Sequence, residues 1–292
     1  NIIPHKINYP KIESADKIIS QKCYVMAKKI YGTTLPEKIK ERLELELNSI
    51  KNNNFASIYL ISSDMVEYSN RLGYEVTSRG SVGDSFVAYL LGITDINPIE
   101  YNLSFEFFAG INYDKEPNID LNFSEIAQAK IFDFLQEKYG KDKIIWGGTI
   151  GTIEHPGRIF IIPENIEITD ICPVEIGENG FLKTHMDYHS IDNIGLYKFD
   201  ILRHAVPTML YELEKETNTS SINIKLDDKE TLELFQHVND MSYPISVDGI
   251  PEFGTTFVKR MIEIAKPQNI NDLFCISALA HGSNTWIYNA DS

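Results

Sequence analysis

The sequence predicts an α+β fold, with a mixed β-sheet flanked by helices. Several segments carry apolar residues at helical spacing, and short strand-like apolar runs lie between them. The two kinds of segment are interspersed rather than strictly alternating, which favours α+β or mixed α/β. With 292 residues, 43% hydrophobic and 24% charged, the chain can bury a large core in one large domain or two smaller ones.

The N-terminal part is expected to be helical. Ser14 is placed to cap a helix that runs to about Tyr31 and ends at Gly32. Residues 55–61 form an apolar run that fits a buried strand or a helix, and its length does not decide between them. A second helix is predicted after Pro36, where apolar residues recur at spacings of four, four and three: Ile39, Leu43, Leu47 and Ile50.

The middle and C-terminal parts mix both kinds of element. A small-residue turn at 77–85 leads into a helix-like run at 86–91, and Ser124 is placed to cap a helix that runs to about Tyr139. The remaining predicted strands are residues 105–111, 119–123, 144–146, 159–162 and 194–202. The remaining predicted helices are residues 207–216, 228–238, 253–265 and 270–279.

Acidic residues on strand-like segments are the best candidates for chemistry. Asn118 and Asp120 leave the same face of a strand, and Asp200 lies inside the apolar run 196–202. An acid in such a run costs free energy unless it is paired or binds a metal. Two neighbouring carboxylates and a third from an adjacent strand can hold two divalent ions for phosphoryl transfer. The same pattern also fits the solvated face of an ordinary strand.

Two other patterns are weaker. Arg79, Gly80 and Ser81 precede a helix, where free N–H groups favour anions, although most such turns have no ligand. His185, Asp187 and His189 would share one strand face, as a metal site or as a hydrogen-bonded polar strand. The sequence HPGR at 155–158 is interpreted as a loop without visible chemistry.

The net charge of −15 disfavours simple phosphate binding, because nonspecific DNA affinity comes from Lys and Arg. The three cysteines are far apart, which argues against a disulfide framework or a cysteine zinc site and favours a reducing cytoplasm. Neither a membrane-spanning segment nor a secretory signal is expected.

Eight segments in order resemble the PolC-type alpha subunit of bacterial DNA polymerase III: SRGSVG at 78–83, PNIDLNF at 117–123, GTIGT at 148–152, HPG at 155–157, THMDYHSI at 184–191, FDIL at 199–202, PEFGT at 251–255 and HG at 281–282. The resemblance implies a nucleotidyltransferase-type palm at 1–210, with an internal deletion near 153–154, and a reduced helical fingers-like region at 211–292. It also implies Mg²⁺ at a two-metal site, with a deoxynucleoside triphosphate and primer–template DNA as substrates. A replisome protein is a further candidate partner.

By the same resemblance, Asp120 and Asp200 match metal-binding catalytic aspartates, and Arg79, Gly80 and Ser81 match the turn that contacts the triphosphate. Asn118 stands where the family has its other catalytic aspartate. Further departures lie around the same site, at Asp84, Arg203, Ala205 and Val206, and Asn284 replaces another acid of the family near the C-terminus.

The family's cysteine-rich zinc insertion before Phe105, its basic segment after Ile153 and a piece around 237–249 have no counterpart here. Two hypotheses follow. The chain is a DNA-directed DNA polymerase palm that is inactive or strongly impaired alone, or a non-catalytic pseudo-polymerase that binds a nucleotide or a replisome protein.

Overall fold

The computed structural model describes residues 9–148, 157–164, 166–177, 180–187, 195–221, 224–226, 228–240, 242–243 and 247–281. The chain divides into two compact units, residues 1–213 and 214–292. The first unit contains a mixed sheet with flanking helices, so the predicted α+β class is confirmed.

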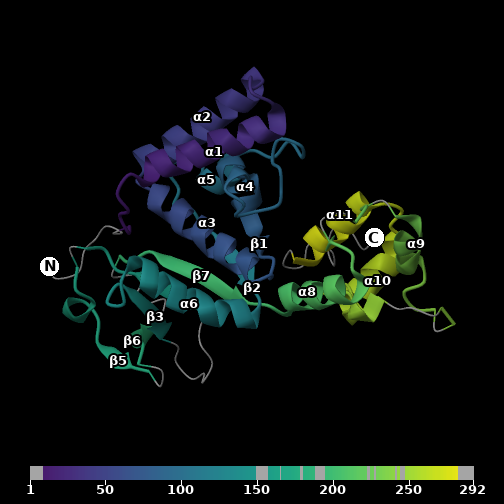
Figure 1. The fold of residues 1–292 in the computed structure, drawn as a ribbon. Coiled ribbons are helices and arrows are strands. Elements are labelled where there is room, and N and C mark those ends of the chain that lie inside the picture. The colour runs from purple at the N-terminus through teal and green to yellow at the C-terminus, as the bar shows by residue number, and fades with distance from the viewer. Residues whose placement is uncertain are drawn as a thin grey trace. The chain divides into compact units, whose positions relative to one another are not determined.

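The sheet of the first unit has seven strands in the order β1-β2-β7-β4-β3-β6-β5 (Figure 1). Strands β2 and β7 are parallel, as are β3 and β6, while the other neighbouring pairs are antiparallel. The strands span Thr77–Arg79 (β1), Asp120–Phe123 (β2), Ile144–Gly148 (β3), Arg158–Ile161 (β4), Val174–Ile176 (β5), Leu182–Asp187 (β6) and Lys198–Arg203 (β7).

Both faces of the central strands are buried. On β3, Ile144 packs into the larger core with the helices, while its neighbour Ile145 packs into a smaller core on the other face. On β4, Ile159 and Phe160 divide in the same way. This division follows from the two-residue period of a strand. The larger core thereby fixes the sheet against the helices.

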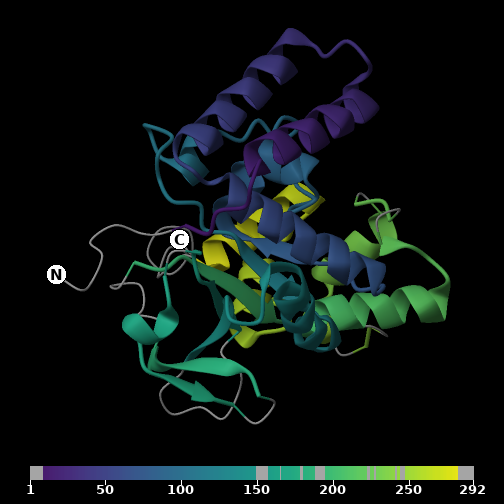
Figure 2. The same cartoon turned by 60° about the vertical axis from the view of Figure 1, so that its left-hand side comes forward.

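The helices of this unit gather around the larger core. Figures 1 and 2 show α1 and α2 side by side, with α3 between this pair and strands β2 and β7. The helices are α1 (Ala15–Tyr31), α2 (Glu37–Asn52), α3 (Ala56–Arg71), α4 (Phe86–Leu90), α5 (Glu106–Ala109) and α6 (Glu125–Tyr139). Among the described residues, no helix combines the length and apolarity needed to cross a membrane.

Several local predictions are resolved by this structure. Residues 56–61 begin helix α3, with Phe55 as its N-cap residue. The first eleven residues of this helix are all buried, so no amphipathic period could reveal it. The strand predicted at 105–111 is wrong: this run forms the short helix α5 and a turn, and Ile111 is 85% exposed.

Ser124 caps α6 as predicted, accepting from the Ala127 N–H at 3.0 Å. The predicted Ser14 cap is wrong, because its side chain makes no capping hydrogen bond.

The second unit, together with the helix that leads into it, is helical in its described part. Helix α8 (Ala205–Thr217) crosses the boundary, and α9 (Lys229–Glu233), α10 (Thr256–Ala265) and α11 (Ile270–His281) follow. Asp228 and Thr255 cap α9 and α10 through their side-chain oxygens. The separate core of this unit includes Phe235, Val247, Met261, Ile262, Leu273 and Ile276.

A buried carboxylate on α2 holds the start of α4. Glu46 is 0% exposed and accepts from Ser85 Oγ at 2.9 Å and from the Phe86 and Val87 N–H groups at 2.9 and 3.0 Å. Burial raises the pKa of Glu46, whereas Arg42 and the two backbone N–H groups oppose this rise. The Arg42 guanidinium lies 2.5 Å from Glu46 and also donates to the backbone carbonyl of Asp84. These bonds fix the chain immediately after the Arg79–Gly80–Ser81 turn.

We expect Glu46→Ala to destabilise the protein by about 3–5 kcal/mol, the scale for removing one partner of a buried ion pair. It would leave the Arg42 Nε–H group and two buried backbone N–H groups without their acceptor. Urea unfolding measures the change. Glu44→Ala is the control, because the Glu44 side chain is 48% exposed, pairs with Lys40 at 3.9 Å and also interacts with Tyr24, and its loss should change stability by less than about 1 kcal/mol. Equal effects of the two substitutions would contradict this role.

Candidate active site

Four neighbouring strands place four charged residues in one cross-strand row. Arg79 on β1 pairs with Asp120 on β2, Asp120 pairs with Asp200 on β7, and Asp200 pairs with Arg158 on β4. Residues opposite one another on adjacent strands project from the same face of a sheet. Across the sheet, the charges of this row are therefore positive, negative, negative and positive. The row brings together residues that are up to 121 positions apart in the chain, from Arg79 to Asp200.

The two aspartates at the centre of the row interact directly. Burial raises the pKa of Asp120, and the charge of Asp200 and a hydrogen bond to its carboxyl group raise it further. Asn118 and Lys198 oppose this rise. Asp200 is only 8% exposed. Two acids this close and this buried need counter-charge or a shared proton to be stable.

Cations of the chain itself supply that counter-charge. The Nε of Arg158 lies 2.7 Å from Oδ1 of Asp200, and the Nζ of Lys198 lies 3.7 Å from Oδ2. The Asn118 side chain donates from Nδ2 to Oδ2 of Asp120 at 2.9 Å. The predicted convergence of Asn118, Asp120 and Asp200 is thus present, with donors directed at both carboxylates.

Sequence reasoning missed the two cations. Lys198 is two residues before Asp200 on the same strand, so strand alternation could have revealed it. The loop interpretation of Arg158 is wrong, because this residue begins β4. Its side chain lies next to Asp200 only because β4 pairs with β7, and no local sequence pattern predicts that pairing.

A glycine allows β4 to approach β7 at this point. Gly157 has a φ of +64°, and its carbonyl accepts from the Ile201 N–H at 2.6 Å. A Cβ at position 157 would lie 2.8 Å from the Ile201 carbonyl oxygen, which also accepts from the Gln128 side chain at 2.6 Å. The close approach at Gly157 therefore sets where Arg158 enters the row.

The residue before β7 helps to place Asn118. The buried Tyr197 hydroxyl donates to the Pro117 carbonyl at 2.7 Å. Since Tyr197 precedes β7 and Pro117 precedes Asn118, this bond joins the two segments that carry the amide and Asp200. The position of Asn118 is thereby coupled to the strand that presents Asp200.

The predicted nucleotide-binding residues lie at the end of the row. Arg79 is exposed at the end of β1, and Gly80 and Ser81 begin a 3₁₀ turn, Gly80–Asp84. Gly80 has a φ of +68° with open space around it, so its backbone conformation, rather than crowding, favours glycine. Burial raises the pKa of the Asp84 carboxyl group, and Arg42 opposes that rise.

The histidines do not form a metal site in the described part of the chain. His185 on β6 pairs with Glu175 at 3.4 Å, and His204 Nδ1 accepts from the Val206 N–H at the start of α8. His189 lies outside the described residues. Among the residues that the structure describes, no three His, Cys, Asp or Glu side chains come together in a way that could hold a metal.

The donor set at Asp120 and Asp200 does not fit the two-Mg²⁺ centre that the resemblance implies. Magnesium requires oxygen ligands in near-octahedral geometry. Here Asn118 directs an N–H donor at one carboxylate, and Arg158 directs a guanidinium at the other. Each group occupies a carboxylate oxygen that a metal ion would need.

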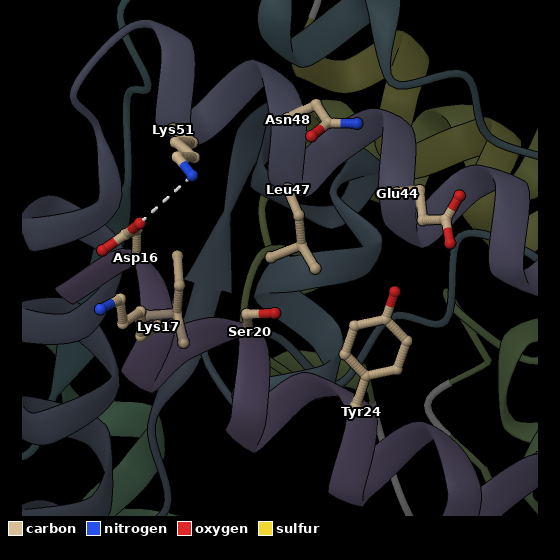
Figure 3. A pocket seen from close by; sticks show the side chains of 9 residues that line it. Asp16, Lys17, Ser20, Tyr24, Glu44, Leu47, Asn48 and Lys51 are labelled. Carbon is tan, nitrogen blue, oxygen red and sulfur yellow. Dashed lines mark ion pairs between the residues drawn. The ribbon is translucent and has the colours of Figure 1, made fainter. Parts of the chain in front are cut away.

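A separate hollow lies between α1 and α2 (Figure 3). Its volume is about 250 Å³, and its lining includes Tyr24, Glu44 and the ion pair between Asp16 and Lys51 at 3.7 Å. None of the residues of the charged row lines it. The hollow is therefore not part of the candidate active site.

The mixed sheet with an aspartate pair on its adjacent parallel strands, together with the helical segment that follows, has the architecture of a nucleotidyltransferase-type polymerase palm with a fingers-like region. Family comparisons agree. Residues 17–155 match the bacterial DNA polymerase III alpha NTPase domain, and residues 198–292 match the bacterial DNA polymerase III alpha subunit finger domain. The chain belongs to the bacterial DNA polymerase III alpha family and resembles its PolC-type members.

The similar proteins are PolC-type DNA polymerases III. The chain is 33% identical to that of Halalkalibacterium halodurans over 381 residues, covering 99% of this chain and 26% of the relative. It is 32% identical to that of Thermotoga maritima over 377 residues, covering 98% of this chain and 28% of the relative. The chain thus spans about a quarter of the length of these relatives.

The comparison also shows internal shortening. The match to the Halalkalibacterium halodurans protein extends over 381 positions, whereas this chain has 292 residues, so about 90 positions have no counterpart here. The confirmed family membership therefore applies to a shortened version of the matched region.

We expect Gly157→Ala to destabilise the protein by more than about 2 kcal/mol, because it combines a left-handed backbone with overlap at the Ile201 carbonyl. Gly180→Ala is the matched control. Gly180 has a φ of +77° but open space, so its substitution should cost only the backbone term of about 1 kcal/mol. Urea unfolding of both variants measures the difference. Equal losses would show that the contact with β7 does not require glycine.

Proposed function

We propose that this chain is a nucleotidyltransferase-type palm at 1–210, with a reduced fingers-like region at 211–292, in which DNA-directed nucleotidyl transfer is absent or strongly impaired. One contact carries the proposal. At the position where the resemblance implies a catalytic aspartate, the Asn118 amide donates to Asp120 Oδ2 at 2.9 Å. An aspartate at position 118 would supply an anionic oxygen ligand to a metal ion. The Asn118 amide instead donates a hydrogen bond to an oxygen of the neighbouring Asp120.

Replacing a metal-binding carboxylate with an amide should greatly lower the rate of nucleotidyl transfer. Metal ions contribute several kcal/mol of charge stabilisation in phosphoryl-transfer transition states, and carboxylates hold those ions. The loss of one such carboxylate should therefore lower the rate by orders of magnitude. The second aspartate of the pair, Asp200, is already engaged by Arg158 and Lys198.

Charge supports the same proposal. The chain has 27 Lys and Arg residues against 42 Asp and Glu residues. DNA affinity arises largely from neutralised phosphates. The basic segment that the resemblance places after Ile153 has no counterpart in this sequence. Binding of primer–template DNA by this chain alone should therefore be weak.

A second candidate is a non-catalytic pseudo-polymerase that binds a nucleotide or a replisome protein. The observation in its favour is the turn that the resemblance assigns to the triphosphate. Arg79 is exposed at the end of β1, and the contacts of Glu46 hold the chain just beyond the turn. Titration with a fluorescent deoxynucleoside triphosphate distinguishes this candidate. Saturable binding that is lost in Arg79→Ala, without primer extension, would support it.

We expect the purified chain to give no primer extension with Mg²⁺ or Mn²⁺, because both metal-binding positions are compromised. Asn118→Asp alone should not restore synthesis, since Arg158 still engages Asp200. A gel-based assay with a PolC-type polymerase as the positive control measures both. Robust synthesis by the unaltered chain would refute the proposed impairment, and recovery by Asn118→Asp alone would show that the amide is its sole cause.

A further inference from the structure

The carboxylate Asp200 is already neutralised by basic side chains of its own sheet. Arg158 contacts Oδ1 at 2.7 Å and Lys198 approaches Oδ2 at 3.7 Å. Asp120 and Asp200 together carry at most two negative charges, and Arg158 and Lys198 together carry two positive charges. These two carboxylates are therefore matched by two basic side chains without any metal ion.

We propose that Arg158 is a built-in counter-cation that occupies the acidic pair in place of a divalent ion and prevents such an ion from binding there. The inference concerns the same sheet face as the proposed function. It rests on the contact of Arg158 with Asp200 and is tested by metal binding, whereas the proposed function is carried by the Asn118 contact and is tested by primer extension, so the two can fail separately.

Geometry makes simultaneous occupancy unfavourable. A Mg²⁺ ion lies about 2.0–2.1 Å from each ligand oxygen. The guanidinium already uses Oδ1 of Asp200 in a charge-assisted hydrogen bond. Asp200 is 8% exposed and the Arg158 side chain 24% exposed, so solvent screens the repulsion between the guanidinium and an incoming ion only partly. A divalent ion would have to displace Arg158.

The backbone holds Arg158 in place. Its position on β4 pairs with Asp200 on β7, and the preceding Gly157 carbonyl accepts from the Ile201 N–H. The register of the sheet thus fixes the backbone of Arg158 opposite Asp200, unlike the backbone of an arginine on a surface loop. Because an arginine is not deprotonated in proteins, this counter-charge persists across the whole accessible pH range.

The contact differs from an ordinary surface ion pair on the same sheet. Arg203 on β7 pairs with Glu125 at 2.9 Å, but its side chain is 51% exposed and that of Glu125 is 66% exposed. The two arginines share a residue type and a short ion pair, and they differ in burial and in their relation to the acidic pair. Arg203 is therefore a matched control.

The test measures Mn²⁺ binding to the full chain. Binding is monitored through the loss of the electron paramagnetic resonance signal of free Mn²⁺. We expect the unaltered chain and Arg203→Ala to bind Mn²⁺ weakly and equally. Arg158→Ala and Arg158→Gln should bind at least about tenfold more tightly, because each removes a positive charge next to the carboxylates. Adding Asp200→Asn to Arg158→Gln should abolish the gain.

Thermal unfolding provides a second readout. Arg158→Gln keeps a hydrogen-bonding side chain and should fold, with a melting temperature that rises on addition of Mn²⁺, whereas that of the unaltered chain should not change. Equal Mn²⁺ affinity in the unaltered chain and both Arg158 variants would overturn the inference. So would a gain in Arg203→Ala as large as that in Arg158→Gln. Neither outcome depends on primer extension, so the proposed function is tested separately.

Discussion

The parallel pairing of β2 with β7 is the constraint on which the candidate site depends. It sets Asp120 directly beside Asp200 on a partly buried sheet face. Two ionised carboxylates on directly paired residues repel each other, and the fold is stable only if another group offsets the repulsion. In this chain Arg158 and Lys198 provide that offset. The flanking strands β1 and β4 therefore matter electrostatically as well as sterically, because they add an arginine at each end of the row.

The sequence predicted the parts of this site better than their assembly. Alternation on residues 119–123 predicted a strand there with Asp120 on its polar face, and the apolar run around Asp200 predicted the other strand. Their adjacency was assumed in the two-metal hypothesis and was predicted by neither pattern. Sheet neighbours are set by contacts between residues far apart in the chain, and no local period encodes them. The same limit hid Arg158, whose partner is 42 positions away.

Local misinterpretations have equally physical causes. Helix α3 is buried on nearly every side, so it lacks the polar face that would have distinguished it from a strand. Residues 105–111 have the apolar composition of a strand, yet Phe107 and Ile111 are exposed at 73% and 85%. Composition indicates which residues can be buried, and tertiary packing decides which of them are. The Ser124 cap was predictable because its hydrogen bond is local.

Two features of the site act in the same electrostatic direction. The amide at 118 removes a negative charge from the position where the resemblance implies an aspartate, and Arg158 adds a positive charge against Asp200. Each lowers the negative potential that attracts divalent ions. Meanwhile Glu46 and Arg42 still brace the chain beside the Arg79–Gly80–Ser81 turn through buried hydrogen bonds. The chain thus combines a scaffold braced beside the turn with an acidic pair whose charge is offset by basic side chains of the same sheet.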